Sequence, residues 1–184
     1  AFFVRAVVGN IPEANQLVES GRAQGQSTYL FSRAFPRLQI VSVESKHSHK
    51  DAGIALQRLA PIPSVSCLFG DSRKILPEIV LSGDVVVIDG PKDLMALELA
   101  LKVMKKNKPS FVFIHDAYRG SELRKYLERK LPWAIYSDEP EFLSRYCFLD
   151  IGIESEKIKK WSNLETQPPN ENYGGTFACL QYRE

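Results

Sequence analysis

The stretch that decides the fold is Val18-Glu19-Ser20-Gly21-Arg22-Ala23-Gln24-Gly25-Gln26-Ser27-Thr28, which follows a short apolar segment. Small residues follow Glu19 at every second position, and hydroxyl residues stand where a helix is expected to begin. Small residues let the backbone approach a ligand closely, and glycine adopts positive φ at little cost. The helix start adds free N–H groups. The stretch therefore predicts a nucleotide-binding turn between a strand and a helix.

A second acid, Glu44, ends the next predicted strand, Leu38–Val43. An acid about 20 residues beyond such glycines, at the tip of the second strand, suits a ribose diol. The spacing differs from the dinucleotide pattern G-x-G-x-x-G, and Glu19 would repel a pyrophosphate. This also disfavours nicotinamide-dependent redox chemistry. We therefore expect a nucleoside that carries a positive charge, and S-adenosylmethionine fits that description.

Strands and helices alternate along most of the chain. The predicted strands are Asn15–Glu19, Leu38–Val43, Val65–Phe69, Asp84–Ile88 and Ser110–Ile114, and the predicted helices are Ser27–Ala34, Lys50–Leu59, Arg73–Leu81, Leu94–Lys106 and Ser121–Lys130. After Pro132 we expect extended segments at Trp133–Tyr136, Arg145–Ile151 and Thr176–Tyr182, with a loop at Gln167–Gly175. This order predicts an α/β fold over residues 1–184 as one domain, with a doubly wound, mostly parallel sheet and an antiparallel C-terminal edge.

Composition limits the function classes. The 184 residues are 44% hydrophobic and carry a net charge of +2, which is too small to imply a nucleic-acid partner. No apolar run approaches the ~20 residues that a membrane span needs. Three widely spaced cysteines lack metal-ligand spacing and are expected to be reduced thiols, as in a cytoplasmic protein.

Each predicted parallel strand ends at polar residues, namely Glu19, Glu44, Asp71 with Ser72, Asp89, and His115 with Asp116. Ligands of such sheets bind beyond the carboxyl ends of the strands. A single acid there often serves as a helix cap. Several acids gathered at one edge repel one another, so the group as a whole predicts a binding site.

These residues resemble a class I S-adenosylmethionine-dependent methyltransferase, and in particular the catechol-type O-methyltransferases. The resemblance runs from about Val18 to Gly120 and rests on Glu19–Ser27, Glu44, Gly70–Pro77, Ile88–Asp93 and Ile114–Ala117. It implies a Rossmann-like sheet of the seven-stranded type and S-adenosylmethionine as cofactor. It also implies methyl transfer to an oxygen of a small molecule or glycan.

The resemblance assigns cofactor-binding roles by position. Gly21, Ala23 and Gly25 would pack against the methionyl part, Ser27 would bind its carboxylate, and Glu19 would lie near its amino group. Glu44 would accept hydrogen bonds from both ribose hydroxyls. Asp71 or Ser72 would touch the adenine, and Asp89 is counted with the cofactor-binding residues as well as with the catalytic ones.

Asp89, Lys92 and Asp116 are the expected catalytic residues. In the family, the two acids hold a divalent cation that lowers the pKa of the acceptor hydroxyl, and Lys92 matches the general base. Ala117 stands where the family has an asparagine ligand. We therefore expect Asp89, Asp116 and His115 as ligands if Mg²⁺ binds. His115 would not serve if it points into the sheet, and we favour transfer with little or no metal dependence.

Several questions stay open at this stage. Fewer than twenty residues precede Glu19, so the acceptor site is open, formed by a partner chain as in a homodimer, or completed by a segment outside this sequence. The chain is either an enzyme or a non-catalytic methyltransferase-like module. Arg119 is either an anion-binding residue or a plain surface arginine. His47 and His49 are expected to be exposed in a loop.

Overall fold

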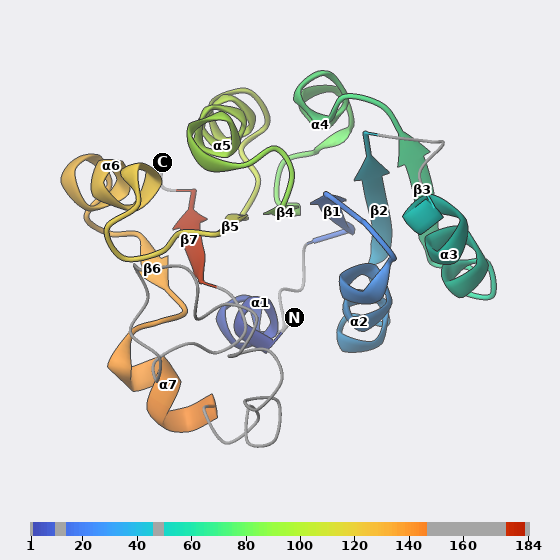
Figure 1. Ribbon diagram of the computed structural model, residues 1–184, viewed down its shortest axis with the longest axis horizontal. Helices are drawn as coiled ribbons and strands as arrows, with labels where there is room; N and C mark the ends of the chain where they lie inside the picture. The colour runs from blue at the N-terminus through green and yellow to red at the C-terminus, as the bar shows by residue number, and fades with distance from the viewer. Residues whose placement is uncertain (1, 10–13, 46–49, 147–175, 183–184) are drawn as a thin grey trace.

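The computed structural model describes residues 2–9, 14–45, 50–146 and 176–182, which include one seven-stranded sheet (Figure 1). Its strands are β1 (Gln16–Ser20), β2 (Gln39–Glu44), β3 (Val65–Phe69), β4 (Val85–Ile88), β5 (Phe111–His115), β6 (Ile135–Tyr136) and β7 (Phe177–Gln181). The helices are α1 (Phe2–Val8), α2 (Gln26–Ala34), α3 (Lys50–Leu59), α4 (Ser72–Ile79), α5 (Asp93–Asn107), α6 (Glu122–Lys130) and α7 (Pro140–Tyr146).

The strand order is β3-β2-β1-β4-β5-β7-β6. Strands β1 to β5 pair in parallel, and β7 runs antiparallel between β5 and β6. The predicted doubly wound sheet with an antiparallel C-terminal edge is thus confirmed. The chain builds outward from β1 to β3 and then returns to the other side of β1, so the topological switch point lies between β1 and β4, where such sheets bind ligands.

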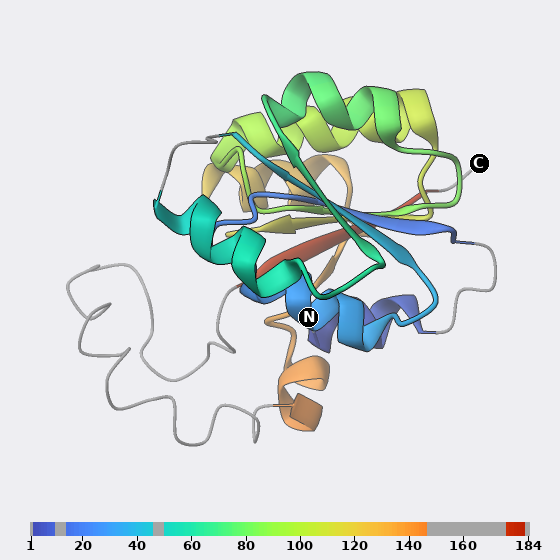
Figure 2. The same ribbon diagram turned by 90° about the vertical axis from the view of Figure 1, so that its right-hand side faces the viewer.

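Helices cover both faces of the sheet. Helices α4, α5 and α6 lie on one face, and α1, α2 and α3 lie on the other (Figures 1 and 2). Each face has its own apolar core, one centred on Leu97 and Ile114 and the other on Phe31 and Phe113. Strand β4 is buried along its whole length, because both of its faces are covered. This packing leaves the strand ends as the open edge.

The segment after β6 corrects one prediction. Arg145 and Tyr146 belong to helix α7, so the extended conformation predicted for the start of Arg145–Ile151 is wrong. Pro140 lies in the first turn of α7, where proline is common, and the negative charge of Glu141 interacts favourably with the helix dipole. The rest of that prediction, and the predicted loop Gln167–Gly175, lie outside the described residues.

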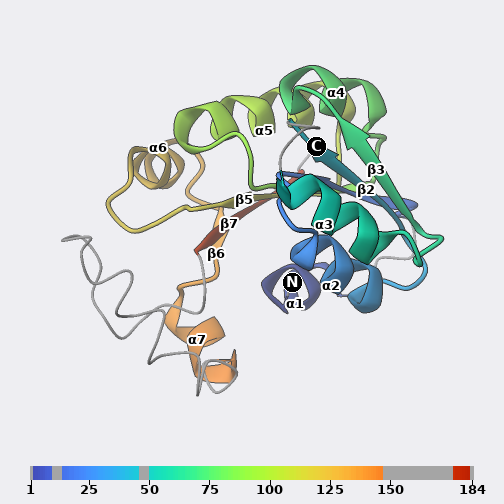
Figure 3. The ribbon, with the colours of Figure 1, turned by 45° about the vertical axis from the view of Figure 1, so that its right-hand side comes forward.

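Helix α1 was not expected from the sequence. It lies beside α2 under the sheet (Figure 3), and its Phe3 is buried against Phe113 of β5 and Phe142 of α7, at ring-centroid distances of 5.7 and 5.1 Å. Phe3 also stacks on Phe177, whose ring packs edge-on against His115 at 4.6 Å. Helix α1 therefore supports the sheet directly beneath the end of β5.

The remaining global predictions concern thiols and membranes. Cys67 and Cys179 are free, as expected, whereas Cys147 lies outside the described residues, as do His47 and His49. Among the helices that the structure describes, none is both long enough and apolar enough to cross a membrane.

Candidate functional site at the carboxyl edge of the sheet

The turn after β1 lies directly against the end of β4. The backbone N–H groups of Asp89 and Gly90 donate to the carbonyl of Ser20, at 2.7 and 3.1 Å. Gly21 has a φ of +94°, and a Cβ there would lie 2.7 Å from the nitrogen of Gly90. Only glycine allows this approach, so the two loops meet at the switch point because residue 21 has no side chain.

The other glycine of the turn, Gly25, serves a different contact. Its φ is +76°, and a Cβ there would lie 2.9 Å from a methyl group of Leu59 in α3. Between the two glycines, Ala23 also has a positive φ of 44°. Gly21 and Gly25 are therefore required by protein packing, whether or not they also border a ligand.

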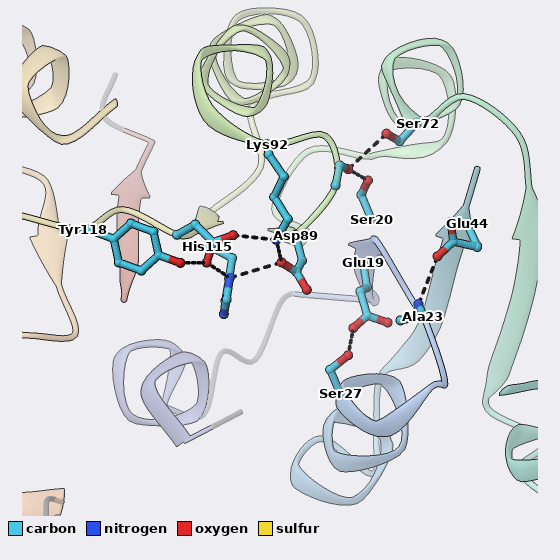
Figure 4. A network of polar contacts seen from close by, with 12 residues as sticks. Glu19, Ser20, Ala23, Ser27, Glu44, Ser72, Asp89, Lys92, His115 and Tyr118 are labelled. Atoms are coloured by element: carbon cyan, nitrogen blue, oxygen red, sulfur yellow. Dashed lines mark hydrogen bonds and ion pairs between the residues drawn. The ribbon is translucent and has the colours of Figure 1, made fainter. Parts of the chain in front are cut away.

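Glu19 is buried at the end of β1 and accepts hydrogen bonds from three hydroxyls, those of Ser27, Thr28 and Ser42. Figure 4 shows the contact with Ser27. Burial raises the pKa of Glu19, although the three hydroxyl groups oppose that shift. The carboxylate thereby fixes the first turn of α2 against β1 and β2. The predicted contacts of Glu19 and Ser27 with the methionyl group remain predictions.

Glu44 ends β2 and faces the turn. Its Oε2 accepts from the backbone N–H of Ala23 at 3.0 Å, and its Oε1 accepts from the N–H of Ser45 at 2.7 Å (Figure 4). The side chain is partly exposed. A carboxylate thus stands at the rim of the turn, where the sequence predicts the ribose.

Asp71 and Ser72 follow β3 at the start of α4. Asp71 caps α4 by accepting from the N–H of Arg73, and its pairing with the Arg73 side chain lowers the pKa of Asp71 to about 2. The hydroxyl of Ser72 donates to the carbonyl of Gly90 at 3.2 Å. Ser72 therefore lies beside the turn contact, while the carboxylate of Asp71 already has partners within its own loop.

Arg22 is a residue whose role the sequence did not reveal. Its guanidinium is buried, donates to the carbonyls of Ser42 and Leu68 at 2.6 and 3.3 Å, and lies 4.7 Å from the ring centre of Phe69. It ties the turn to β2 and β3 from beneath. Ser42, a serine within the mostly apolar strand Leu38–Val43, was the one sequence feature that indicated buried polar contacts here.

At the ends of β4 and β5, a charged cluster gathers around Lys92. The Lys92 Nζ lies 2.5 Å from Asp89 Oδ1 and 2.6 Å from Asp116 Oδ2 (Figure 4). His115 Nδ1 lies 2.8 Å from Asp116 Oδ1 and 3.1 Å from Asp89 Oδ1. The Tyr118 hydroxyl donates to Asp116 at 2.5 Å. The predicted proximity of the two aspartates is confirmed, and His115 points toward them.

The cluster fixes the charges of its members. Partial burial lowers the pKa of Lys92, but hydrogen bonds to Asp116 and Asp89 outweigh it, so the pKa lies above its ordinary value. Burial raises the pKa of Asp116, but His115, Lys92 and Tyr118 bring it well below its usual range. Burial and then Asp116 raise the pKa of Tyr118. Lys92 is therefore an ammonium group at neutral pH, which disfavours its predicted role as general base.

The site offers some features of a cation-binding centre. The ligand atoms of Asp89, His115 and Asp116 all lie within 4.8 Å of one another. However, Ala117 is buried in the apolar core and its N–H donates to the carbonyl of Thr176, so it supplies no ligand. The Lys92 ammonium also bridges the two carboxylates. The residues present therefore do not fit a divalent ion alongside Lys92 in this arrangement.

The other half of the edge consists of the turn after β1 and the end of β2. Gly21 lies against the backbone of Asp89 and Gly90, and Glu44 offers a partly exposed carboxylate facing the turn. Arg119, a candidate anion-binding residue in the sequence, instead pairs with the buried Asp138 at 3.1 Å. Among the described contacts, this pair joins the loop after β5 to the segment before α7.

Comparison with known proteins identifies the fold. No family model matches the chain, and no curated protein matches it in sequence. The O-methyltransferase TomG from Streptomyces achromogenes, solved with S-adenosylmethionine, has a TM-score of 0.56 at 17% identity over 98% of this chain and 78% of its own. Phosphoethanolamine N-methyltransferase 2 from Haemonchus contortus, also solved with S-adenosylmethionine, scores 0.54 at 13% identity over 100% and 52%.

A third neighbour is precorrin-6y C5,15-methyltransferase from Geobacter metallireducens, with a TM-score of 0.54 at 12% identity over 73% of this chain and 70% of its own. The chain thus has the Rossmann-like fold of the class I S-adenosylmethionine-dependent methyltransferases. The names of these neighbours differ in the acceptor atom. At this level of identity the likeness establishes the fold, and function must be argued from the site.

Proposed function

We propose that this chain is an S-adenosylmethionine-dependent methyltransferase. The observation that carries the proposal is the contact of Gly21 with Asp89 and Gly90 at the switch point, with Glu44 facing the same turn. Strand topology places ligands there. The partly exposed acids at this place, Glu44 and Asp89, favour a cationic ligand over a pyrophosphate.

Each element of the edge has a proposed task. Glu44 accepts hydrogen bonds from the ribose hydroxyls, Ser72 and the Asp71 loop border the adenine, and the turn from Gly21 to Gly25 borders the methionyl part. Glu19 and Ser27 hold the start of α2 in place beneath it. When bound, S-adenosylmethionine supplies a reactive methyl group, so the protein mainly orients the acceptor.

We propose an oxygen of a small molecule or glycan as the acceptor, at the ends of β4 and β5. Asp89 is the proposed proton acceptor, because its side chain is 37% exposed whereas that of Asp116 is 18% exposed. Lys92, held as an ammonium group by both acids, orients the acceptor oxygen by hydrogen bonding. A homodimer and a cytoplasmic location are further proposals.

The test is calorimetric titration with S-adenosylmethionine and S-adenosylhomocysteine, followed by incubation with a panel of catechols, phenols and glycans. We expect one-to-one binding of both nucleosides and acceptor-dependent release of S-adenosylhomocysteine. If the chain bound neither nucleoside, the proposed methyltransferase function would be wrong. Binding without turnover on any acceptor would support the non-catalytic module.

A further inference from the structure

The position of Lys92 is unusual for a residue expected to remove protons. Lys92 precedes α5 as its N-terminal cap residue, and its side chain reaches across the strand ends to both Asp89 and Asp116. Both contacts join an ammonium group to a carboxylate, which is the charge-assisted type of hydrogen bond. The side chain therefore occupies the space between the two carboxylates.

Two carboxylates at neighbouring strand ends need a positive charge between them. Adjacent strands lie about 4.8 Å apart, and acids at that separation repel unless a cation or a proton intervenes. Within the described residues, the Lys92 ammonium supplies the charge.

The surroundings of the pair do not provide what a divalent ion requires. Magnesium prefers octahedral oxygen coordination, and calcium takes six to eight oxygen ligands, as general rules. Here the residue after Asp116 is Ala117, whose methyl group is buried in the core. Asp89 Oδ1 is already shared between Lys92 and His115. An incoming ion would have to displace the ammonium group and would be repelled by it.

We propose that the Lys92 ammonium is the resident cation of this site, replacing a divalent metal. It holds Asp89 and Asp116 together and excludes metal ions from them. An ammonium group has three N–H donors, and the two carboxylates engage two of them. The remaining donor is available to the acceptor oxygen, a role that rests on the proposed methyltransferase function.

Direct metal binding tests the inference without any acceptor. Mn²⁺ binding would be measured by electron paramagnetic resonance and calorimetry on the parent chain, on Lys92→Met and on Lys92→Met/Asp116→Asn. We expect no specific site in the parent. Lys92→Met should bind Mn²⁺ at least about tenfold more tightly than the parent's non-specific binding, because two carboxylates lose their cation. The double variant should lose that site. Lys92→Arg, which keeps the charge, should behave like the parent.

Lys102→Met is the matched control, since Lys102 is an exposed lysine of helix α5, which Lys92 caps, and its loss should leave metal binding unchanged. A Mn²⁺ site in the parent that Asp116→Asn abolishes would overturn the inference, and this result does not require Lys92→Met to fold. Absence of binding in a folded Lys92→Met protein would also overturn it. S-adenosylmethionine binding, measured separately, decides the proposed function whatever the metal result.

Discussion

The two halves of the carboxyl edge stabilise their carboxylates in different ways. Around β1 and β2, the buried Glu19 is surrounded by neutral hydroxyl donors. Around β4 and β5, Asp116 is held by the Lys92 ammonium, with His115 and Tyr118 beside it. In the first half the buried Arg22 guanidinium donates to backbone carbonyls, whereas in the second half the Lys92 ammonium pairs directly with the carboxylates. Carboxylates at equivalent strand ends thus have two chemically distinct environments.

The largest expected effect comes from the point where the halves meet. Gly21→Ala should destabilise the fold by about 3 kcal/mol, because a Cβ would combine a strained positive φ with a clash against the backbone of Gly90. Urea denaturation measures this change. Gly120→Ala is the matched control, since Gly120 has a φ of +84° but a Cβ there would meet nothing within 4 Å. Equal losses in both variants would mean that the contact between the halves contributes nothing.

The half of the edge around β4 and β5 should make the folded protein less stable in acid. The pKa of Asp116 is lowered in the folded state, so its contribution is present above the unfolded value of 3.8 and is lost as pH falls below it. Between pH 5 and 2.5, the parent should therefore lose stability relative to Asp116→Asn, at up to about 1.4 kcal/mol per pH unit. Parallel stability curves for the two proteins would contradict the role assigned to Lys92.

The half of the edge around β1 and β2 should change the stability of the protein with pH in the opposite direction. The pKa of Glu19 is raised by burial, so its contribution is present below the unfolded value of 4.5 and is lost as pH rises through the folded pKa. Between pH 5 and 8, the parent should therefore lose stability relative to Glu19→Gln. Thermal unfolding across this range measures the difference. A gain in the parent would mean that the three hydroxyl groups outweigh burial.

The smallest expected effect concerns the hydrogen bond between the start of α4 and the loop after β4. Ser72→Ala removes the hydrogen bond to the Gly90 carbonyl and should cost about 1 kcal/mol of stability. Chemical denaturation detects this loss. Ser82→Ala serves as a comparison, because Ser82 is exposed and its hydroxyl lies 3.5 Å from the Lys108 carbonyl, too far for a strong bond. A loss in Ser82→Ala as large as in Ser72→Ala would deny Ser72 a special role.

The sequence predicted the sheet well because local patterns determine it. The run Val85–Ile88 is apolar throughout, and the polar residues that follow each strand mark the open edge. The sequence did not predict helix α1, because contacts with distant residues, such as that of Phe3 with Phe142, accompany it and no local pattern indicates them. The helical state of Arg145 was missed because an apolar pattern was given more weight than the helix start at Pro140.

The site was predicted in outline only. Strand-end positions predicted that Asp89 and Asp116 would be neighbours, since register follows from topology. Side-chain direction does not follow from topology, so the bridging position of Lys92 and the orientation of His115 required the structure. The buried layer of Arg22 with Ser42 was likewise hidden, because its contacts join residues from different strands.

The most direct measurement is titration of S-adenosylmethionine into the parent chain and into Glu44→Ala, with Gln39→Ala at the exposed opposite end of β2 as the control. We expect the parent and the control to bind with equal affinity. Glu44→Ala should bind more weakly by about 1.5–3 kcal/mol, the range for hydrogen bonds to a charged group. No binding by the parent, or unchanged affinity in Glu44→Ala, would contradict the assignment of this edge as the cofactor site.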